Sequence, residues 1–120
     1  MESPLIGIVG PCSAGKSVLA RGLRERGYQV KEIRQEHSGV PDMWLQITNP
    51  DLLLYVDVSL DVGAQRERLA KPSSWWIEER EVRLAHARQH CDFYIDTSAL
   101  TPDEVLYQAL AFLEDVMRET

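Results

Sequence analysis

The sequence has few cysteines, no long apolar run and no excess of positive charge, and each absence excludes a class of protein. Two cysteines among 120 residues cannot build a disulfide framework, so we expect two free thiols and a cytoplasmic location. The longest apolar run, residues 52–56, is too short to cross a bilayer, and no secretory signal is expected. With 13 Lys and Arg against 19 Asp and Glu, the net charge is −6, which argues against a nucleic-acid partner.

The length and composition indicate one globular domain over residues 1–120. A chain of this size buries roughly two-thirds of its unfolded surface, so its core needs no disulfide or structural metal. The residues are 44% hydrophobic and 27% charged, as in ordinary soluble domains. No internal repeat or linker divides the chain.

Apolar runs and helical periods alternate along the chain. Short apolar or alternating runs predict four strands, at residues 5–9, 28–33, 51–58 and 91–96. Helical spacing and start signals predict helices that begin at Lys16 and stop at Gly27, that span 41–47, 60–69 and 76–90, and that begin at Thr101. This alternation predicts an α/β domain with a parallel sheet of about four strands and helices on both faces.

One motif dominates the sequence. Eight residues match the phosphate-binding P-loop pattern G-x-x-x-x-G-K-[ST], namely Gly10, Pro11, Cys12, Ser13, Ala14, Gly15, Lys16 and Ser17. The backbone amides of such a loop surround phosphate oxygens, while its lysine lies between the β- and γ-phosphates and its serine hydroxyl binds Mg²⁺. The motif therefore predicts that these residues and Val18 bind ATP or another nucleoside triphosphate together with Mg²⁺.

The whole chain resembles a shortened member of the P-loop kinase group that includes shikimate, adenylate and related nucleoside or nucleotide kinases. Beyond the loop, the resemblance rests on residues 54–59, on the helix that follows them, and on residues 83–97. It implies a three-layer αβα P-loop NTPase fold and Mg-ATP-dependent transfer of phosphate to a small-molecule acceptor. It also implies that Arg66 and Arg68 belong to a lid over the transferring phosphate and that Arg88 lies near the adenine or the phosphates.

The chain departs from that group after its second strand. Only residues 34–50 separate the second and third expected strands, so one strand and most of the acceptor-binding region are missing. A second interpretation therefore stays open, in which the chain is a nucleotide-binding module or weak ATPase with a regulatory or partner-binding role. A homodimer could complete an acceptor pocket that one chain is too short to enclose. A GTPase is disfavoured because the guanine-reading N-K-x-D motif is absent.

Two carboxylates are candidates for the metal shell or the catalytic base. Asp57 ends an apolar strand, as a Walker B aspartate does. Glu36 follows the strand that we expect beside the P-loop strand, and we favour it slightly. Both assignments stay open, because a solvated carboxylate at a strand end is common. His37, next to Glu36, is either a base or hydrogen-bond donor or an exposed loop histidine.

Cys12 and the histidines give two weaker signals. Cys12 lies in the loop beside helix N-terminal donors, where a thiolate would be stabilised, although a simple filling role in the loop is the favoured interpretation. His86 and His90 are one helical turn apart, with no third ligand near them in the sequence. We therefore expect no zinc site.

Overall fold

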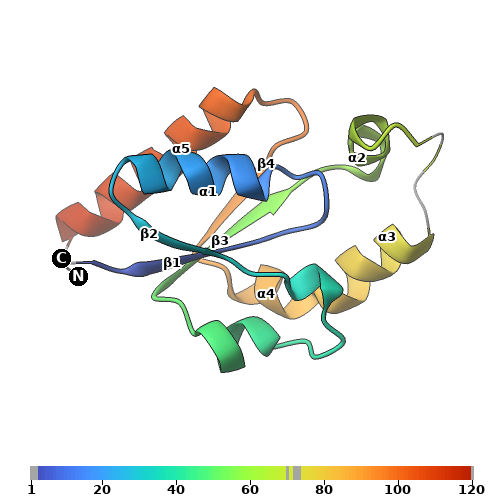
Figure 1. Ribbon diagram of the computed structural model, residues 1–120, viewed down its shortest axis with the longest axis horizontal. Helices are drawn as coiled ribbons and strands as arrows, with labels where there is room; N and C mark the ends of the chain where they lie inside the picture. The colour runs from blue at the N-terminus through green and yellow to red at the C-terminus, as the bar shows by residue number, and fades with distance from the viewer. Residues whose placement is uncertain (1–2, 70, 72–73, 120) are drawn as a thin grey trace.

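The four strands form one parallel sheet. The computed structural model describes residues 3–69, 71 and 74–119. Its strands lie in the order β2-β1-β3-β4 (Figure 1), with bounds β1 Leu5–Val9, β2 Gln29–Glu32, β3 Leu52–Asp57 and β4 Phe93–Asp96. β1 lies between two neighbours, since Ile6 pairs with Val30 on β2 and with Leu52 on β3. The predicted α/β domain with a four-stranded parallel sheet is confirmed.

Helices cover both faces of this sheet. The first face carries α1 (Lys16–Glu25) and α5 (Pro102–Glu119), and the second carries α4 (Ala85–His90) with the short turns η1 (Gln35–His37) and η2 (Trp44–Thr48) (Figure 1). β3 is buried along its whole length because side chains from both layers contact it. None of the described helices is long and apolar enough to cross a membrane.

The helix expected over residues 76–90 is broken. It consists of α3 (Ser74–Glu78), a π-helical turn η3 (Glu79–Arg83) and α4. A π-helical turn adds a residue to the helical turn and changes the direction of the side chains that follow it. The sequence pattern did not indicate this break, and the break places Glu79 in the interior.

One helix end follows the sequence signals, and another departs from them. Thr101 and Glu104 form a reciprocal cap at the start of α5, with Glu104 N donating to Thr101 Oγ1 at 3.1 Å and Thr101 N donating to Glu104 Oε1 at 2.9 Å. The helix expected over 60–69 ends earlier, as α2 (Leu60–Arg66). Arg68, two residues beyond it, has a φ of +60° that no helix allows.

The parallel arrangement brings four connections to one edge of the sheet. The carboxyl ends of parallel strands meet at the same edge, and ligands of open α/β sheets bind there. At this edge lie the loop between β1 and α1, the segment after β2 that contains η1, and the residues that follow β3 and β4. The candidate site is built from these connections.

Candidate functional site

The loop that links β1 to α1 has a tightly curled backbone. Gly10 has a φ of +155°, and a side-chain Cβ at this position would lie 2.0 Å from the carbonyl oxygen of Val56. Gly15 has a φ of +95°, which also favours glycine. α1 begins directly after this turn, at Lys16. The predicted nucleotide-binding residues, from Gly10 to Val18, therefore lie together in one strand–loop–helix connection.

The Lys16 side chain folds back over the loop. Its Nζ donates hydrogen bonds to the carbonyl oxygens of Gly10, at 2.7 Å, and Pro11, at 3.1 Å. The same nitrogen forms an ion pair with Glu36 Oε2 at 2.7 Å. The structure thus brings together two of the predicted catalytic residues, Lys16 and Glu36.

The segment after β2 holds Glu36 against the loop. The adjacent Gln35 is fully buried and anchors this segment, because its side-chain amide donates to the carbonyl oxygens of Val40 and Arg83 and its carbonyl oxygen accepts from the Trp44 amide. Glu36 itself is 4% exposed. Its second oxygen, Oε1, is buried and has no hydrogen-bond partner among the described residues.

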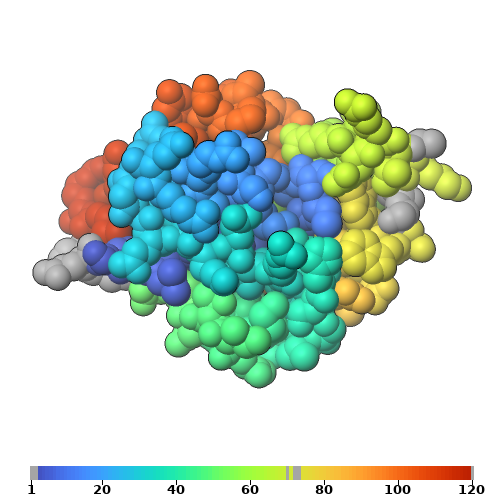
Figure 2. Space-filling view, viewed as in Figure 1, coloured from blue at the N-terminus to red at the C-terminus, as the bar shows by residue number. Residues whose placement is uncertain are grey.

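His37 lies at the open side of this carboxylate. Its Nε2 is 3.9 Å from Glu36 Oε2, and its ring stacks on that of Trp75 with the ring centres 5.6 Å apart. This contact joins the segment after β2 to α3, and Figure 2 shows the two segments side by side on the surface. About half of the His37 side chain is exposed.

A second buried carboxylate, Glu79, reaches the loop from η3. Glu79 Oε1 accepts a hydrogen bond from the Cys12 amide at 3.0 Å, and Oε2 lies 3.9 Å from Cys12 Sγ. Burial raises the pKa of Glu79, the charge of Glu36 adds to this effect, and the hydrogen bonds from Cys12 oppose it. Sequence reasoning missed Glu79 because a charged residue within the expected helix over residues 76–90 gives no sign of being buried. The π-helical turn that buries Glu79 leaves no signal in the hydrophobic spacing.

The environment of Cys12 corrects one prediction. Both cysteines are free, as expected. Burial, together with the negative charges of Glu79 and Glu36, raises the pKa of the Cys12 thiol to about 11, against the opposing effect of Lys16. The stabilised thiolate, the less favoured of the two interpretations of Cys12, is therefore wrong. Burial is the largest cause of this shift, and the carboxylates that add to it are distant in sequence and meet Cys12 only in the folded chain.

The Ser17 hydroxyl is paired with a residue that the sequence analysis did not select. Ser17 Oγ donates to Glu32 Oε1 at 2.7 Å, and Glu32 is the last residue of β2. The position of Glu32 at the end of a strand beside β1 is the sequence feature that could have identified it. The structure thus places a hydroxyl and a carboxylate oxygen together, which is the type of donor that Mg²⁺ prefers.

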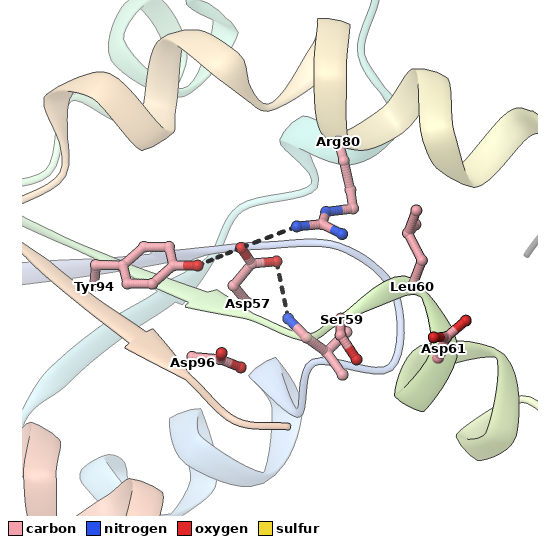
Figure 3. Close-up of a pocket in the computed structure, with 8 residues that line it drawn as sticks. Asp57, Ser59, Leu60, Asp61, Arg80, Tyr94 and Asp96 are labelled. Atoms are coloured by element: carbon pink, nitrogen blue, oxygen red, sulfur yellow. Dashed lines mark hydrogen bonds and ion pairs between the residues drawn. The ribbon is translucent and has the colours of Figure 1, made fainter. Parts of the chain in front are cut away.

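Asp57 lies on the opposite side of β1 from Glu36, and its carboxylate is held by several partners. Its Oδ1 accepts from the Val58 amide at 2.8 Å, while Oδ2 accepts from the Tyr94 hydroxyl at 2.5 Å and lies 3.4 Å from Arg80 Nη2. Figure 3 shows Tyr94 and Arg80 pointing toward this carboxylate beside a cavity of about 370 Å³. Burial and the nearby Asp57 raise the pKa of the Tyr94 hydroxyl. The structure pairs Ser17 with Glu32, not with Asp57.

The predicted arginines occupy three different environments. Arg66 Nη1 donates to the Ser13 carbonyl oxygen at 2.8 Å, and Arg66 Nη2 donates to the Thr97 carbonyl oxygen at 2.7 Å. Arg68 is exposed in the turn after α2. Arg88 lies on α4, against the second face of the sheet, where its charge acts on the Tyr55 hydroxyl. Of the three, Arg66 is the one that the described contacts bring to the loop.

A second cavity, of about 260 Å³, opens beside the loop and Arg66. Its polar lining comes from Ser13, Arg66 and Thr97. The apolar part of its lining consists of Ala14, Val18, Leu19, Leu100, Pro102 and Val105. A concave and mostly apolar cavity with a few polar groups is the usual form of a small-molecule site.

No protein-family model matches this chain, and no curated protein matches it. The functional interpretation therefore rests on the residues and their geometry.

Proposed function

We propose that the chain has a P-loop NTPase fold and is a Mg-ATP-dependent phosphotransferase that acts on a small-molecule acceptor. The observation that carries the proposal is the G-x-x-x-x-G-K-S loop, curled between a central strand and a helix, with its lysine and an amide already bound to carboxylates. Glu36 binds the Lys16 ammonium, and Glu79 binds the Cys12 amide. Carboxylate oxygens here occupy donors that suit the oxygens of a polyphosphate.

The neighbouring cavity supports a nucleotide as the ligand. It begins at loop residues Ser13 and Gly15 and continues between α1 and the start of α5. An apolar slot that leads away from a phosphate site suits a nucleoside base, and the Arg66 guanidinium at its rim supplies a flat cationic surface. Arg66 contacts the loop itself through Ser13, so it can respond to the phosphates as well as to the base.

The donor set at the start of α1 fits Mg²⁺. Ser17 Oγ and Glu32 would hold the ion, since both offer oxygen and Glu32 is partly open to solvent. Bound there with the nucleotide, Mg²⁺ would neutralise charge on the phosphate oxygens. Lys16 would bind the β- and γ-phosphates, and Glu36, once released from Lys16, would accept the proton of an acceptor hydroxyl. Asp57, held by Tyr94 and Arg80, is the less favoured metal residue.

Nucleotide binding must exchange contacts that the loop now makes internally. Lys16 has to leave Glu36, and the Cys12 amide has to leave Glu79, before either can bind a phosphate. The raised pKa of Glu79 makes this carboxyl easier to protonate than an exposed glutamate, which favours release of the Cys12 amide to a phosphate.

The same two contacts favour a second candidate, a nucleotide-binding module or weak ATPase without an acceptor site. Glu36 and Glu79 are both buried against the loop, and few residues lie between β2 and β3 to enclose an acceptor. In this case the chain binds a nucleotide and hydrolyses it slowly, in a regulatory or partner-binding role. A homodimer that completes the acceptor side would favour the kinase instead.

The test is nucleotide-dependent stabilisation of the wild-type chain against Lys16→Met. A panel of ATP, GTP and ADP, each with and without Mg²⁺, is measured by thermal shift. At 100 times its dissociation constant a ligand stabilises the wild type by about 2.7 kcal/mol, and Lys16→Met should lose most of this effect. The matched control is Lys31→Met, which removes an exposed lysine on β2 and should keep the full shift.

A second measurement separates the two candidates. Release of ADP is followed with nucleosides, nucleotides and small alcohols as acceptors. Stimulation by one acceptor supports the phosphotransferase, and a flat basal rate supports the module. A wild-type chain that no triphosphate stabilises would contradict both.

A further inference from the structure

Three side chains with metal-binding chemistry meet at the outer rim of the loop. One ligand atom from each of Cys12, Glu36 and His37 lies within 4.8 Å of the other two. The sequence analysis did not find this group, because Cys12 is 24 positions before Glu36 and only the parallel pairing of β1 with β2 brings them together. We propose that these three residues bind a divalent cation of borderline softness, of the Zn²⁺ class.

The buried oxygen of Glu36 is an independent sign of a ligand. Oε1 of Glu36 is buried and lacks a hydrogen-bond partner among residues 3–69, 71 and 74–119, and the side chain as a whole is 5% exposed. Buried carboxylate oxygens are rarely left unpaired, since water no longer solvates them. A cation bound between Glu36, Cys12 and His37 would satisfy this oxygen.

The ligand set selects the class of metal. A thiolate, an imidazole and a carboxylate together suit Zn²⁺ and its relatives, whereas Mg²⁺ and Ca²⁺ take oxygen ligands. Ligand atoms around a tetrahedral Zn²⁺ lie roughly 3.5 Å apart, as its bond lengths of about 2.0 to 2.3 Å require. The three ligand atoms lie within 4.8 Å of one another, so each pair would have to approach by at most about 1.3 Å to reach this spacing. Three protein ligands leave the fourth position for water or a substrate oxygen.

The surrounding charges permit a cation despite Lys16. The Lys16 ammonium contacts Oε2 of Glu36, which is also the oxygen 3.9 Å from His37 Nε2, so the cation would bind Oε1 or replace Lys16 at Oε2. Glu79 adds a second buried carboxyl group, with Oε2 3.9 Å from Cys12 Sγ. On binding, Cys12 gives its thiol proton to solvent and its thiolate forms a bond to the ion, so the thiolate, Glu36 and a neutral His37 together balance the charge of a dication.

The experiment titrates the chelator-stripped full chain with Zn²⁺ by calorimetry and with Co²⁺ by absorption spectroscopy. We expect one ion per chain and a thiolate-to-cobalt charge-transfer band. Cys12→Ser should lose that band, and both Cys12→Ser and His37→Gln should bind Zn²⁺ at least tenfold more weakly, since even residues that only orient metal ligands are worth about 10–100-fold. His37 is half exposed, so His37→Gln tests the site even where Cys12→Ser does not fold.

Matched controls come from a second thiol and a second histidine pair. His86 and His90 stack with ring centres 4.2 Å apart and form the obvious adventitious metal site, while Cys91 is the other free thiol. Cys91→Ser and His90→Gln should both keep one tight site and the charge-transfer band. The proposal is overturned if these two variants lose the site, if His37→Gln binds as tightly as the wild type, or if the wild type binds no zinc.

The proposed zinc site and the proposed nucleotide site can be tested independently of each other. Lys16→Met should lose the nucleotide shift but bind Zn²⁺ at least as tightly as the wild type, because it removes a positive charge beside Glu36. Loss of zinc binding in this variant would contradict the proposed site. A wild-type chain that binds zinc but no nucleotide would overturn the proposed function alone.

Discussion

Two buried carboxylates, Glu36 and Asp57, lie on opposite sides of β1, and their partners differ. Glu36 is 4% exposed and Asp57 is 3% exposed, and each has a cationic side chain beside it. Both oxygens of Asp57 are occupied, by the Val58 amide on one side and by Tyr94 and Arg80 on the other. Glu36 shares one oxygen with Lys16 and leaves the other unpaired among the described residues. Asp57 therefore has a structural role, whereas the unpaired oxygen of Glu36 can still bind a ligand or a proton.

The largest effect on stability should come from Asp57→Ala. Removing Asp57 takes away the acceptor of charge-assisted hydrogen bonds, which costs about 1.5–3 kcal/mol when the partner groups are partly buried. Here those groups are Arg80 and the Tyr94 hydroxyl. Urea unfolding measures the loss. The control, Asp61→Ala, removes an exposed acid from the lining of the same cavity and should change the free energy of unfolding by less than about 0.5 kcal/mol. Equal losses of unfolding free energy in Asp57→Ala and Asp61→Ala would contradict a structural role for Asp57.

Glu36→Gln should change turnover and spare the fold. Glutamine fills the same volume and its carbonyl oxygen can still accept from Lys16, so we expect a smaller loss of unfolding free energy than in Asp57→Asn, where three contacts depend on the carboxylate. Under the proposed phosphotransferase function, loss of Glu36 as the general base should lower the rate by about 10²-fold or more, measured as acceptor-stimulated ADP release. Asp57→Asn is the matched variant on the other side of β1 and should lower stability more than rate. Equal ratios of lost stability to lost rate in Glu36→Gln and Asp57→Asn would contradict this difference between the two carboxylates.

The smallest expected effect is the contribution of Glu79 to the pH dependence of the free energy of unfolding. Its pKa is raised in the folded chain, so the folded state binds the proton more tightly than the unfolded state does. The contribution to stability is complete below the ordinary glutamate pKa of about 4.3 and falls as the pH rises through the raised value. The hydrogen bonds from Cys12 offset part of the shift, which keeps the effect small.

Glu79→Gln should therefore gain stability relative to the wild type as the pH increases from acid to neutral. Urea unfolding at a series of pH values measures this difference. Glu78→Gln changes the exposed neighbouring residue and should leave the pH profile unaltered. A constant difference between Glu79→Gln and the wild type across the pH range would contradict the raised pKa.

Much of the fold was predictable because its signals are local. The strand at residues 5–9 was predicted with its observed bounds, and Thr101 caps α5 with the expected Glu104. Strand β3 is apolar on both faces, and this composition is enough to indicate a central position in the sheet. The continuous helix over 76–90 failed as a prediction, because amphipathic spacing does not reveal a π-helical turn.

The candidate site was predictable only in part. The loop and Lys16 carry a motif of contiguous residues, and Glu36 was selected from its place after a strand. Glu79 and Glu32 were missed, and the less favoured interpretation of Cys12 as a stabilised thiolate was wrong. The failures at Glu79 and Cys12 share a physical origin, since burial and electrostatic fields depend on groups that are distant along the chain, whereas Glu32 had a local signal in its place at a strand end.

Local sequence and hydrophobic patterns thus specified the four strands, the starts of α1, α2 and α5 and the glycine-rich turn, because they act over a few neighbouring residues. Tertiary packing selected which of two similar carboxylates faces Lys16, buried Glu79 beneath the loop and raised the pKa of the Cys12 thiol. Those outcomes depend on strand order and on the desolvation of particular atoms, and neither exists until the chain has folded.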